Sequence, residues 1–330
     1  MQKSLWIKAA VVFALMLALL VPLGMIDGLV SERAGRQAQV VEDIAASSAG
    51  SQHLFGPVLV VPYNEHWQET VEVSQNGKLK KRLEERVEGH EVRFLPEQLN
   101  INGNLTPETK HRGLFQVRSY VLDSEFKGRF AIPPGIGHPQ PLHKGRIVFG
   151  TPYVAVTVAD MRGVLAAPGV DWNGKRFGFE QGPGLYFTQT TGMHATVDAL
   201  TDSEAATDIP FAFTLKLRGL ENLDLVPAGR QTHVALTSPW PHPGFHGRFL
   251  PDPQAQEIGP EGFRVAWSVN ALASNVADSL RQCKELNCFD SFGVRLVDPV
   301  NIYSLSDRAT KYGFLFVGLT FAAIFLFEVL

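Results

Sequence analysis

Cysteine is scarce in this chain of 330 residues, which contains only two. Four residues separate Cys283 from Cys288. In an oxidising compartment this spacing allows a small disulfide loop, whereas in the cytosol it leaves two ordinary thiols. A metal site needs more ligands than this pair offers, and no histidine lies close to it in the sequence. We therefore treat the pair as a disulfide candidate.

The sequence also lacks the motifs that mark an enzyme or a cofactor site. It contains no Gly-x-Ser-x-Gly, no His-Glu-x-x-His and no Gly-x-Gly-x-x-Gly. The nearest approach to a phosphate loop, residues 169–176, has no Ser or Thr after its lysine, so we interpret Asn173-Gly174 as a β-turn. His242 and His246 cannot share a metal from one helical face, because prolines and a glycine around them exclude that helix. We predict no enzyme activity, cofactor or metal.

Neither sign of charge predominates, since 30 Lys and Arg stand against 33 Asp and Glu. A nucleic-acid partner requires a concentrated basic face, so none is predicted. The densest charged tract, residues 78–86, alternates in sign behind Asn76-Gly77. Asn-Gly is a strong hairpin signal, and we therefore predict that residues 68–73 pair with 80–87 in a solvated hairpin.

Long apolar runs are confined to the two ends of the chain. Ala9 to Ile26 contains no charge, and neither does Gly313 to Phe327, which includes five phenylalanines. Both runs approach the length that spans a bilayer. We predict a signal anchor with a short cytoplasmic tail at residues 1–30, with a cleaved signal as the alternative. At residues 311–330 we expect the start of a C-terminal membrane region, cut inside its first helix. The basic residues that flank the runs are balanced and leave the orientation open.

The middle of the chain is polar and rich in glycine and proline. Residues 31–50 predict a membrane-proximal helix, and short β-type runs separated by turn residues follow from residue 54. One further helix is predicted over residues 270–285. The fold class is therefore mainly β (α+β), with sandwich-like sheets flanked by transmembrane helices.

An internal sequence similarity suggests two related β units, at residues 54–190 and 191–306. Phe126–Pro133 resembles Phe245–Pro251, since each has two phenylalanines four apart around Gly-Arg, followed by proline. Such a segment is typical of a strand with a glycine bend and a proline stop. We therefore predict a duplication from this one short match.

Two groups of residues are candidates for a site. Asp160-Met-Arg162-Gly163 follows a predicted strand and could place an acid and a base at a strand end. The alternative is structural: Arg162 pairs with a nearby carboxylate or backbone carbonyls, and Gly163 turns the chain.

An aromatic segment and one acid complete the candidates. Trp240, Phe245 and Phe249 could form a contact surface, because aromatic side chains dominate binding hot spots. The favoured alternative is that these rings pack into the core. Glu328 follows the C-terminal apolar run, and an acid at membrane depth is a functional candidate. Its alternative is a carboxylate that reaches the headgroups.

Seven stretches of the sequence occur in a characteristic order, namely residues 54–63, 112–117, 126–133, 160–163, 240–251, 298–303 and 308–328. Together they resemble the CreD family of bacterial inner-membrane proteins, and the resemblance covers essentially the whole chain. It implies an N-terminal anchor, a large periplasmic domain and a C-terminal membrane region of several helices. It also implies a role in envelope integrity, colicin tolerance and the β-lactam stress response, with no established catalytic residues. A periplasmic domain in turn favours the Cys283–Cys288 disulfide.

The leading functional hypothesis is a multi-pass inner-membrane protein whose periplasmic domain binds another envelope component. Its partners are then the lipid bilayer and other inner-membrane or envelope components. The second hypothesis is a transporter or channel-like component, in which further C-terminal helices carry the function and Glu328 lines a polar path. An envelope hydrolase is the third hypothesis and has no motif to support it.

Overall fold

The computed structural model describes residues 2–75, 78–113, 115–182, 184–185, 191–200, 204–283, 285–298 and 302–329. The chain divides into two compact units. The helical unit comprises Met1–Ile44, His111–Phe115 and Asp298–Leu330, and the β unit comprises Ala45–Lys110 and Gln116–Val297.

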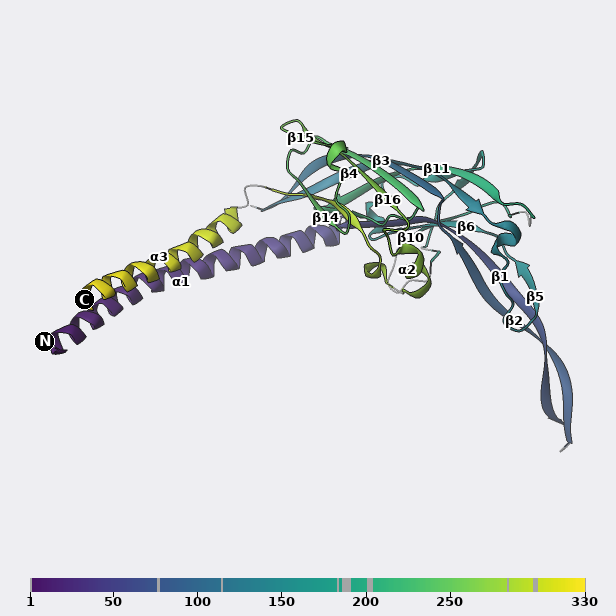
Figure 1. The fold of residues 1–330 in the computed structure, drawn as a ribbon, viewed down its shortest axis with the longest axis horizontal. Coiled ribbons are helices and arrows are strands. Elements are labelled where there is room, and N and C mark those ends of the chain that lie inside the picture. The colour runs from purple at the N-terminus through teal and green to yellow at the C-terminus, as the bar shows by residue number, and fades with distance from the viewer. Residues whose placement is uncertain are drawn as a thin grey trace. The chain divides into compact units, whose positions relative to one another are not determined.

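Two helices dominate the helical unit, α1 (Gln2–Ser47) and α3 (Ile302–Val329). They lie side by side (Figure 1), and a Cβ added to Gly313 of α3 would lie 3.1 Å from Cδ2 of Leu23 in α1. Trp6–Ser47 and Leu305–Phe327 are long and apolar enough to cross a membrane, judged by length and composition. Most large apolar side chains on both helices are exposed. Such surfaces suit a hydrocarbon environment better than water.

The predicted anchor at 1–30 and the predicted helix at 31–50 form one continuous helix. α1 runs without interruption to Ser47, and the first strand begins at Gln52. The polar residues after Ile26 include good helix formers and no proline, so the helix continues beyond the apolar run.

The β unit contains two sheets, which confirms the mainly β fold class (Figure 1). Among the described residues, the first sheet, sheet A, has the strand order β14 (Pro243–Gly247), β17 (Phe292–Leu296), β12 (Asn222–Leu225), β1 (Gln52–Gln75), β6 (Tyr153–Val158), β10 (Gly192–Thr196) and β9 (Glu180–Gln181). Two more strands pair with β1, namely β2 (Lys78–Phe94) and β5 (Arg146–Phe149).

The second sheet, sheet B, runs in the order β15 (Gln256–Gly259), β16 (Gly262–Asn270), β13 (Gln231–Ser238), β3 (Gln98–Arg112), β4 (Phe115–Ile132), β11 (Thr207–Leu220), β7 (Gly169–Trp172) and β8 (Lys175–Gly178). One cluster of buried side chains takes members from both sheets. Strands with alternating buried and exposed residues, such as β11, point one face into this core. Phe126 of β4 stacks on Phe213 of β11 with 4.6 Å between ring centroids.

The structure contains the hairpin and the β-turn that the sequence predicts. β1 and β2 pair antiparallel from Leu59↔Phe94 to Gln75↔Lys78, which confirms the predicted hairpin, while Asn76 and Gly77 lie outside the described residues. Asn173 and Gly174 connect β7 to β8 with φ of 48° and 81°. Positive φ at both central residues is the backbone of a type I′ turn, so the turn interpretation is confirmed.

The predicted helix at 270–285 is shorter than expected. α2 spans Val276–Gln282. The Asn270 side chain accepts hydrogen bonds from the N–H groups of Leu272 and Ala273, and this local turn occupies the residues before the helix.

The two predicted β units, 54–190 and 191–306, both contribute strands to both sheets. β1 pairs with β12, and β4 pairs with β11. The two similar segments, Phe126–Pro133 and Phe245–Pro251, also lie in different sheets, one in central β4 and the other starting in β14 at an edge. The duplication stays a prediction, and the fold gives its two segments unlike surroundings.

Candidate functional site

The Asp160–Arg162 pair binds the segment with which the β unit begins, at Ala45 to Gly50. The Arg162 guanidinium binds both Asp160 oxygens and donates to the carbonyls of Ala45 (3.0 Å) and Ala46 (2.5 Å). Asp160 also accepts from the backbone N–H of Gly50 at 3.1 Å. The Arg162 hydrogen bonds hold the pKa of Asp160 below its ordinary value, and Asp160 in turn raises the pKa of Arg162. The Arg162 guanidinium is paired with a carboxylate and two carbonyls, and the Asp160 carboxylate is paired with Arg162 and a backbone N–H. This pairing fits the structural alternative.

Gly163 is required by close packing. A Cβ at this position would lie 2.3 Å from the carbonyl oxygen of Arg218 and 2.5 Å from Nε2 of Gln52. Gln52 is fully buried, and its amide donates to the carbonyls of Asp160 and Arg218. The contacts of these three residues agree with the structural alternative, because each of them holds neighbouring segments of the β unit together.

The aromatic segment packs against the core. Phe245 meets Trp267 edge to face at 5.7 Å between centroids, and Phe249 meets Phe292 at 6.1 Å. The Trp240 indole N–H donates to the carbonyls of His242 and Val297, and the Arg118 guanidinium lies 4.7 Å from the Trp240 ring centroid. These contacts agree with the packing alternative favoured for the three rings.

The two cysteines are neighbours with free thiols. Cys283 is half-buried and Cys288 is exposed. A hydrogen bond with Cys288 raises the pKa of the Cys283 thiol, and burial acts in the same direction. The predicted disulfide remains a prediction. Glu328 lies in α3, and its side chain is outside what the structure describes.

The sequence did not reveal a row of polar side chains that crosses sheet A. In the strand register, His53 of β1 faces Asp224 of β12, Asp224 faces Gly293 of β17, and Gly293 faces His246 of β14. Residues aligned in this way share one face of the sheet. His246 Nε2 lies 2.7 Å from Asp224 Oδ1. Burial lowers the pKa of His53 against the opposing effect of Asp224.

This row does not form a metal centre. Within the described ranges, no group of three His, Cys, Asp or Glu side chains could hold a metal ion. His246 pairs with Asp224 and not with His242. The row is a half-buried cluster of two histidines and one carboxylate.

Glu65 is a second buried acid, and it holds a loop. Its side chain is 1% exposed and accepts from the backbone N–H groups of Leu142 (2.8 Å), His143 (2.7 Å) and Gly145 (2.9 Å). Burial raises the pKa of Glu65, but these three N–H groups and His143 together outweigh it and lower the pKa. The His143 ring stacks on Trp67 at 4.0 Å between centroids. The Glu65 oxygens are therefore already engaged in holding this loop.

A large groove of the β unit lies between β2 and α2. Its volume is about 1050 Å³. The strand wall is the run Glu91–Leu95, and the helix wall is the face of α2 that carries Ala277 and Leu280. Binding pockets commonly measure about 300–1,000 Å³, so the groove has the size of a ligand site. Arg93 bridges the two walls by donating to the Leu280 carbonyl at 3.1 Å.

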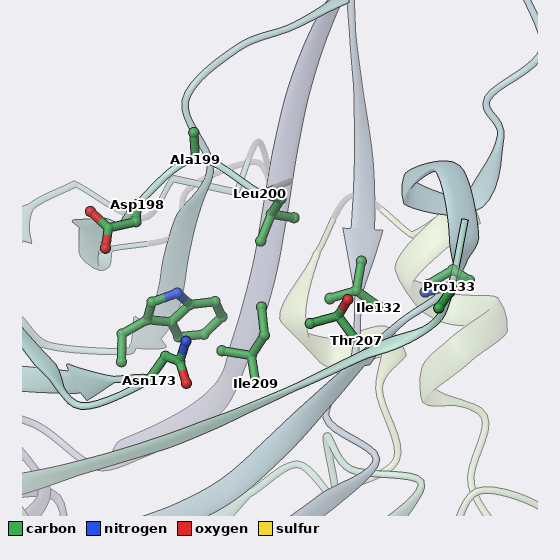
Figure 2. Close-up of a pocket in the computed structure, with 10 residues that line it drawn as sticks. Ile132, Pro133, Asn173, Asp198, Ala199, Leu200, Thr207 and Ile209 are labelled. Carbon is green, nitrogen blue, oxygen red and sulfur yellow. The ribbon is translucent and has the colours of Figure 1, made fainter. Parts of the chain in front are cut away.

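A smaller hollow lies beside sheet B (Figure 2). Its volume is about 140 Å³. Leu200 and Ile209 face it, and Asp198 lies at its margin. Asp198 is paired with Lys175 at 2.7 Å. A hollow well below about 300 Å³ is too small for most ligands, so the β2–α2 groove is the better candidate site.

Comparison with known proteins identifies the family. The family model described as Inner membrane protein CreD matches residues 4–330. The chain belongs to the CreD family. Inner membrane protein CreD of Escherichia coli strain K12 is 29% identical over an alignment of 332 residues, which covers 100% of this chain and 70% of that relative. The resemblance drawn from the sequence is thus confirmed, and this CreD family chain is an inner membrane protein.

Solved structures add nothing to the CreD family assignment. An M1 zinc metallopeptidase of Deinococcus radiodurans matches at 10% identity over 53% of this chain and 39% of that chain, with a TM-score of 0.27. A two-domain M1 zinc metallopeptidase matches at 9% identity over 61% of this chain and 42% of that chain, with a TM-score of 0.28. This chain spans about two fifths of those peptidases, and TM-scores this low carry no argument.

Proposed function

We propose that this CreD family chain is a membrane-held binding protein whose β unit lies in the periplasm. In this role it supports envelope integrity and the response to colicins and β-lactams by binding an envelope component, not by catalysis. The observation that carries the proposal is the β2–α2 groove. Its volume is that of a ligand site, and both apolar and charged side chains line it.

The two candidate membrane helices support this arrangement. α1 leads into the β unit at its start, and α3 follows it at its end. A domain joined to the bilayer through both of its ends stays at the membrane surface, where its partners are the bilayer and other inner-membrane or envelope components. In the oxidising periplasm, the neighbouring thiols of Cys283 and Cys288 would form a disulfide.

Thiol labelling of intact cells tests the location of the β unit. A membrane-impermeant maleimide should label Cys283 and Cys288 only after reduction with a phosphine, because the pair is oxidised and outside the cytoplasm. A Cys283→Ser variant leaves Cys288 as an exposed thiol and should be labelled without reduction. Labelling that appears only after lysis would place the β unit in the cytoplasm and sink the proposal.

A complementation assay tests the role itself. Cells that lack the chain should differ from wild type in their susceptibility to β-lactams or colicins, and the full chain should restore the original level. If the role were catalytic, soluble envelope fractions that contain the chain would convert a substrate, and that turnover could be measured. Identical susceptibility with and without the chain would contradict the envelope role.

A further inference from the structure

The β1–β2 hairpin continues beyond the rest of sheet A. β2 pairs with β1 along its whole length. Among the described residues, β1 pairs with no strand other than β2 beyond His66, where its pairing with β5 ends. Residues 67–75 and 78–86 therefore form a ribbon of only two strands, which we call the hairpin arm. Figure 1 shows it running out from sheet A.

The outer edge of β2 is open along the hairpin arm. In the part of the chain that the structure describes, β1 is the only strand that pairs with β2. Every second residue of such an edge points its backbone N–H and C=O away from the ribbon, where they can pair with another strand. Two strands alone are marginally stable in water, so a further strand at this edge would stabilise the arm.

The order of charges along this edge indicates which strand fits. The run Lys81-Arg82-Leu83-Glu84-Glu85 places two bases before an apolar residue and two acids after it. If β2 pairs antiparallel with β2 of a second copy, centred on Leu83, then Lys81 faces Glu85 of the copy and Arg82 faces Glu84 of the copy. Symmetry repeats both pairs on the other side of the centre. The edge is therefore complementary in charge to itself.

The two bases of this run have no acidic partner within the chain. Lys81 and Arg82 are exposed, and no acid among the described residues forms an ion pair with either of them. Glu72 lies opposite Lys81 in the strand register, yet the two side chains do not pair. Leu83 is apolar and 64% exposed. A second copy would give both bases a carboxylate and cover the leucine.

The two acids of the run are held only loosely. Glu84 lies 3.7 Å from the Arg86 guanidinium, whose closer partner is Glu69 at 3.0 Å. Glu85 is exposed and lies 3.4 Å from Nδ1 of His66. Ion pairs this long and exposed contribute little, so both carboxylates can accept hydrogen bonds from a second copy.

Strand geometry also permits a register centred on one residue. Outward-pointing backbone groups alternate along a strand, and opposite residues of an antiparallel pair must both point toward the partner strand. A register centred on Leu83 pairs position 81 with 85 and 82 with 84, so outward groups always meet outward groups. It also sets Arg86 opposite Lys80 of the copy, and Glu69 offsets one of these two positive charges.

We propose that the hairpin arm is a dimerisation site, at which β2 pairs antiparallel with β2 of a second copy of this chain about Leu83. The same residues contribute from both copies, as a twofold interface requires. The pairing joins two ribbons into a sheet of four strands. It uses residues outside the lining of the β2–α2 groove and does not depend on the proposed function.

Cysteine cross-linking tests the symmetry of the dimer. Both natural cysteines are first changed to serine. Leu83→Cys should then give a disulfide-linked dimer when membranes are oxidised, because opposite Cα atoms lie about 4.5–5.5 Å apart, within reach of a disulfide. Thr70→Cys is the matched control, since exposed Thr70 lies opposite Leu83 on β1 and would be about 14 Å from its copy. No dimer from Leu83→Cys, or equal cross-linking of both variants, overturns the proposal.

Charge reversal tests the predicted register. Lys81→Glu places acids at both positions 81 and 85, and Glu85→Lys places bases at both. Each variant of the full chain in detergent should raise the dissociation constant of the dimer by about tenfold or more, measured by light scattering over a concentration series. An equimolar mixture of the two variants should recover the dimer, because each acid then faces a lysine. That recovery also shows that both variants are folded.

Other outcomes contradict the dimer and leave the proposed function untouched. An unaltered chain that is monomeric at every concentration overturns the proposal. So does a dimer that neither charge reversal weakens, since its copies then meet at another surface. If thiol labelling places the β unit in the cytoplasm, the proposed function fails. Cross-linking of Leu83→Cys in isolated membranes with a permeant oxidant still decides the dimer by itself.

Discussion

Replacing Gly163 with alanine adds one methyl group where the chain leaves no room for it. The new Cβ would lie 2.3 Å from the Arg218 carbonyl oxygen and 2.5 Å from Gln52 Nε2. Neither atom can yield easily, because the first belongs to a paired strand and the second donates two hydrogen bonds from a fully buried side chain. The backbone of Gly163 is not left-handed, so the cost comes from space alone.

The expected destabilisation follows from those contacts. Overpacking costs about 1–3 kcal/mol, and each disturbed hydrogen bond of Gln52 adds about 1 kcal/mol. The lower chain entropy of alanine in the unfolded state returns about 0.4–1 kcal/mol. A net loss of about 2–4 kcal/mol lowers the thermal midpoint of a domain of this size by about 5–15 °C.

Thermal unfolding of the full chain in detergent, followed by tryptophan fluorescence, measures this shift, because Trp172 and Trp267 are buried in the β unit. Gly178→Ala is the matched control. Gly178 also has an ordinary φ, and its added Cβ would meet nothing within 4 Å, so its midpoint should stay near that of the unaltered chain. If Gly163→Ala is as stable as Gly178→Ala, the packing argument for the motif is wrong.

Two further predictions concern buried titratable groups. Burial lowers the pKa of His53, and Asp224 raises it by a smaller amount. Asp224→Asn should therefore lower the pKa of His53 further, which an NMR titration of the imidazole can measure. An unchanged pKa would contradict the coupling between the two side chains. A histidine with a lowered pKa favours the neutral form, so its contribution to stability is present above about pH 6.5 and falls as the pH drops below it. Because the pKa of Glu65 is lowered, its contribution to stability is present above its unfolded pKa of about 4.3 and is lost as the pH falls through the folded value. Glu65→Gln should therefore flatten the acid limb of the stability profile and speed amide exchange at Leu142 and Gly145, and an unchanged acid limb would refute this.

Local sequence patterns predicted the parts of this fold that depend on neighbouring residues. Asn173-Gly174 gave a turn with two positive φ values, and the alternating charges after Gly77 marked the second strand of a long hairpin. The uncharged runs at both ends likewise marked the helices long enough to cross a membrane. Each of these features is decided by composition or turn chemistry within a few residues.

The sites that depend on strand pairing could not be predicted in this way. His53 meets Asp224 only because β1 and β12 pair in parallel, and a parallel partner can come from any distance along the chain. The groove likewise combines residues 91–95 with Arg230 and with residues of α2, which lie far apart in the sequence. A single histidine such as His246 gives no signal in the sequence, because its partner Asp224 is brought to it by strand pairing.

The groove is the better binding candidate because two of its charged side chains, Arg230 and Arg281, are exposed and only loosely paired. Arg162 and Glu65 have their hydrogen-bonding capacity occupied by carbonyls, carboxylates or backbone N–H groups at 2.5–3.0 Å. A ligand at those places would first have to break contacts that hold the fold. Arg230 and Arg281 face acids at 3.7 Å and 4.0 Å, beside a strand edge with no pairing strand among the described residues. A ligand that contacts these two arginines would break fewer close hydrogen bonds than a ligand at Arg162 or Glu65.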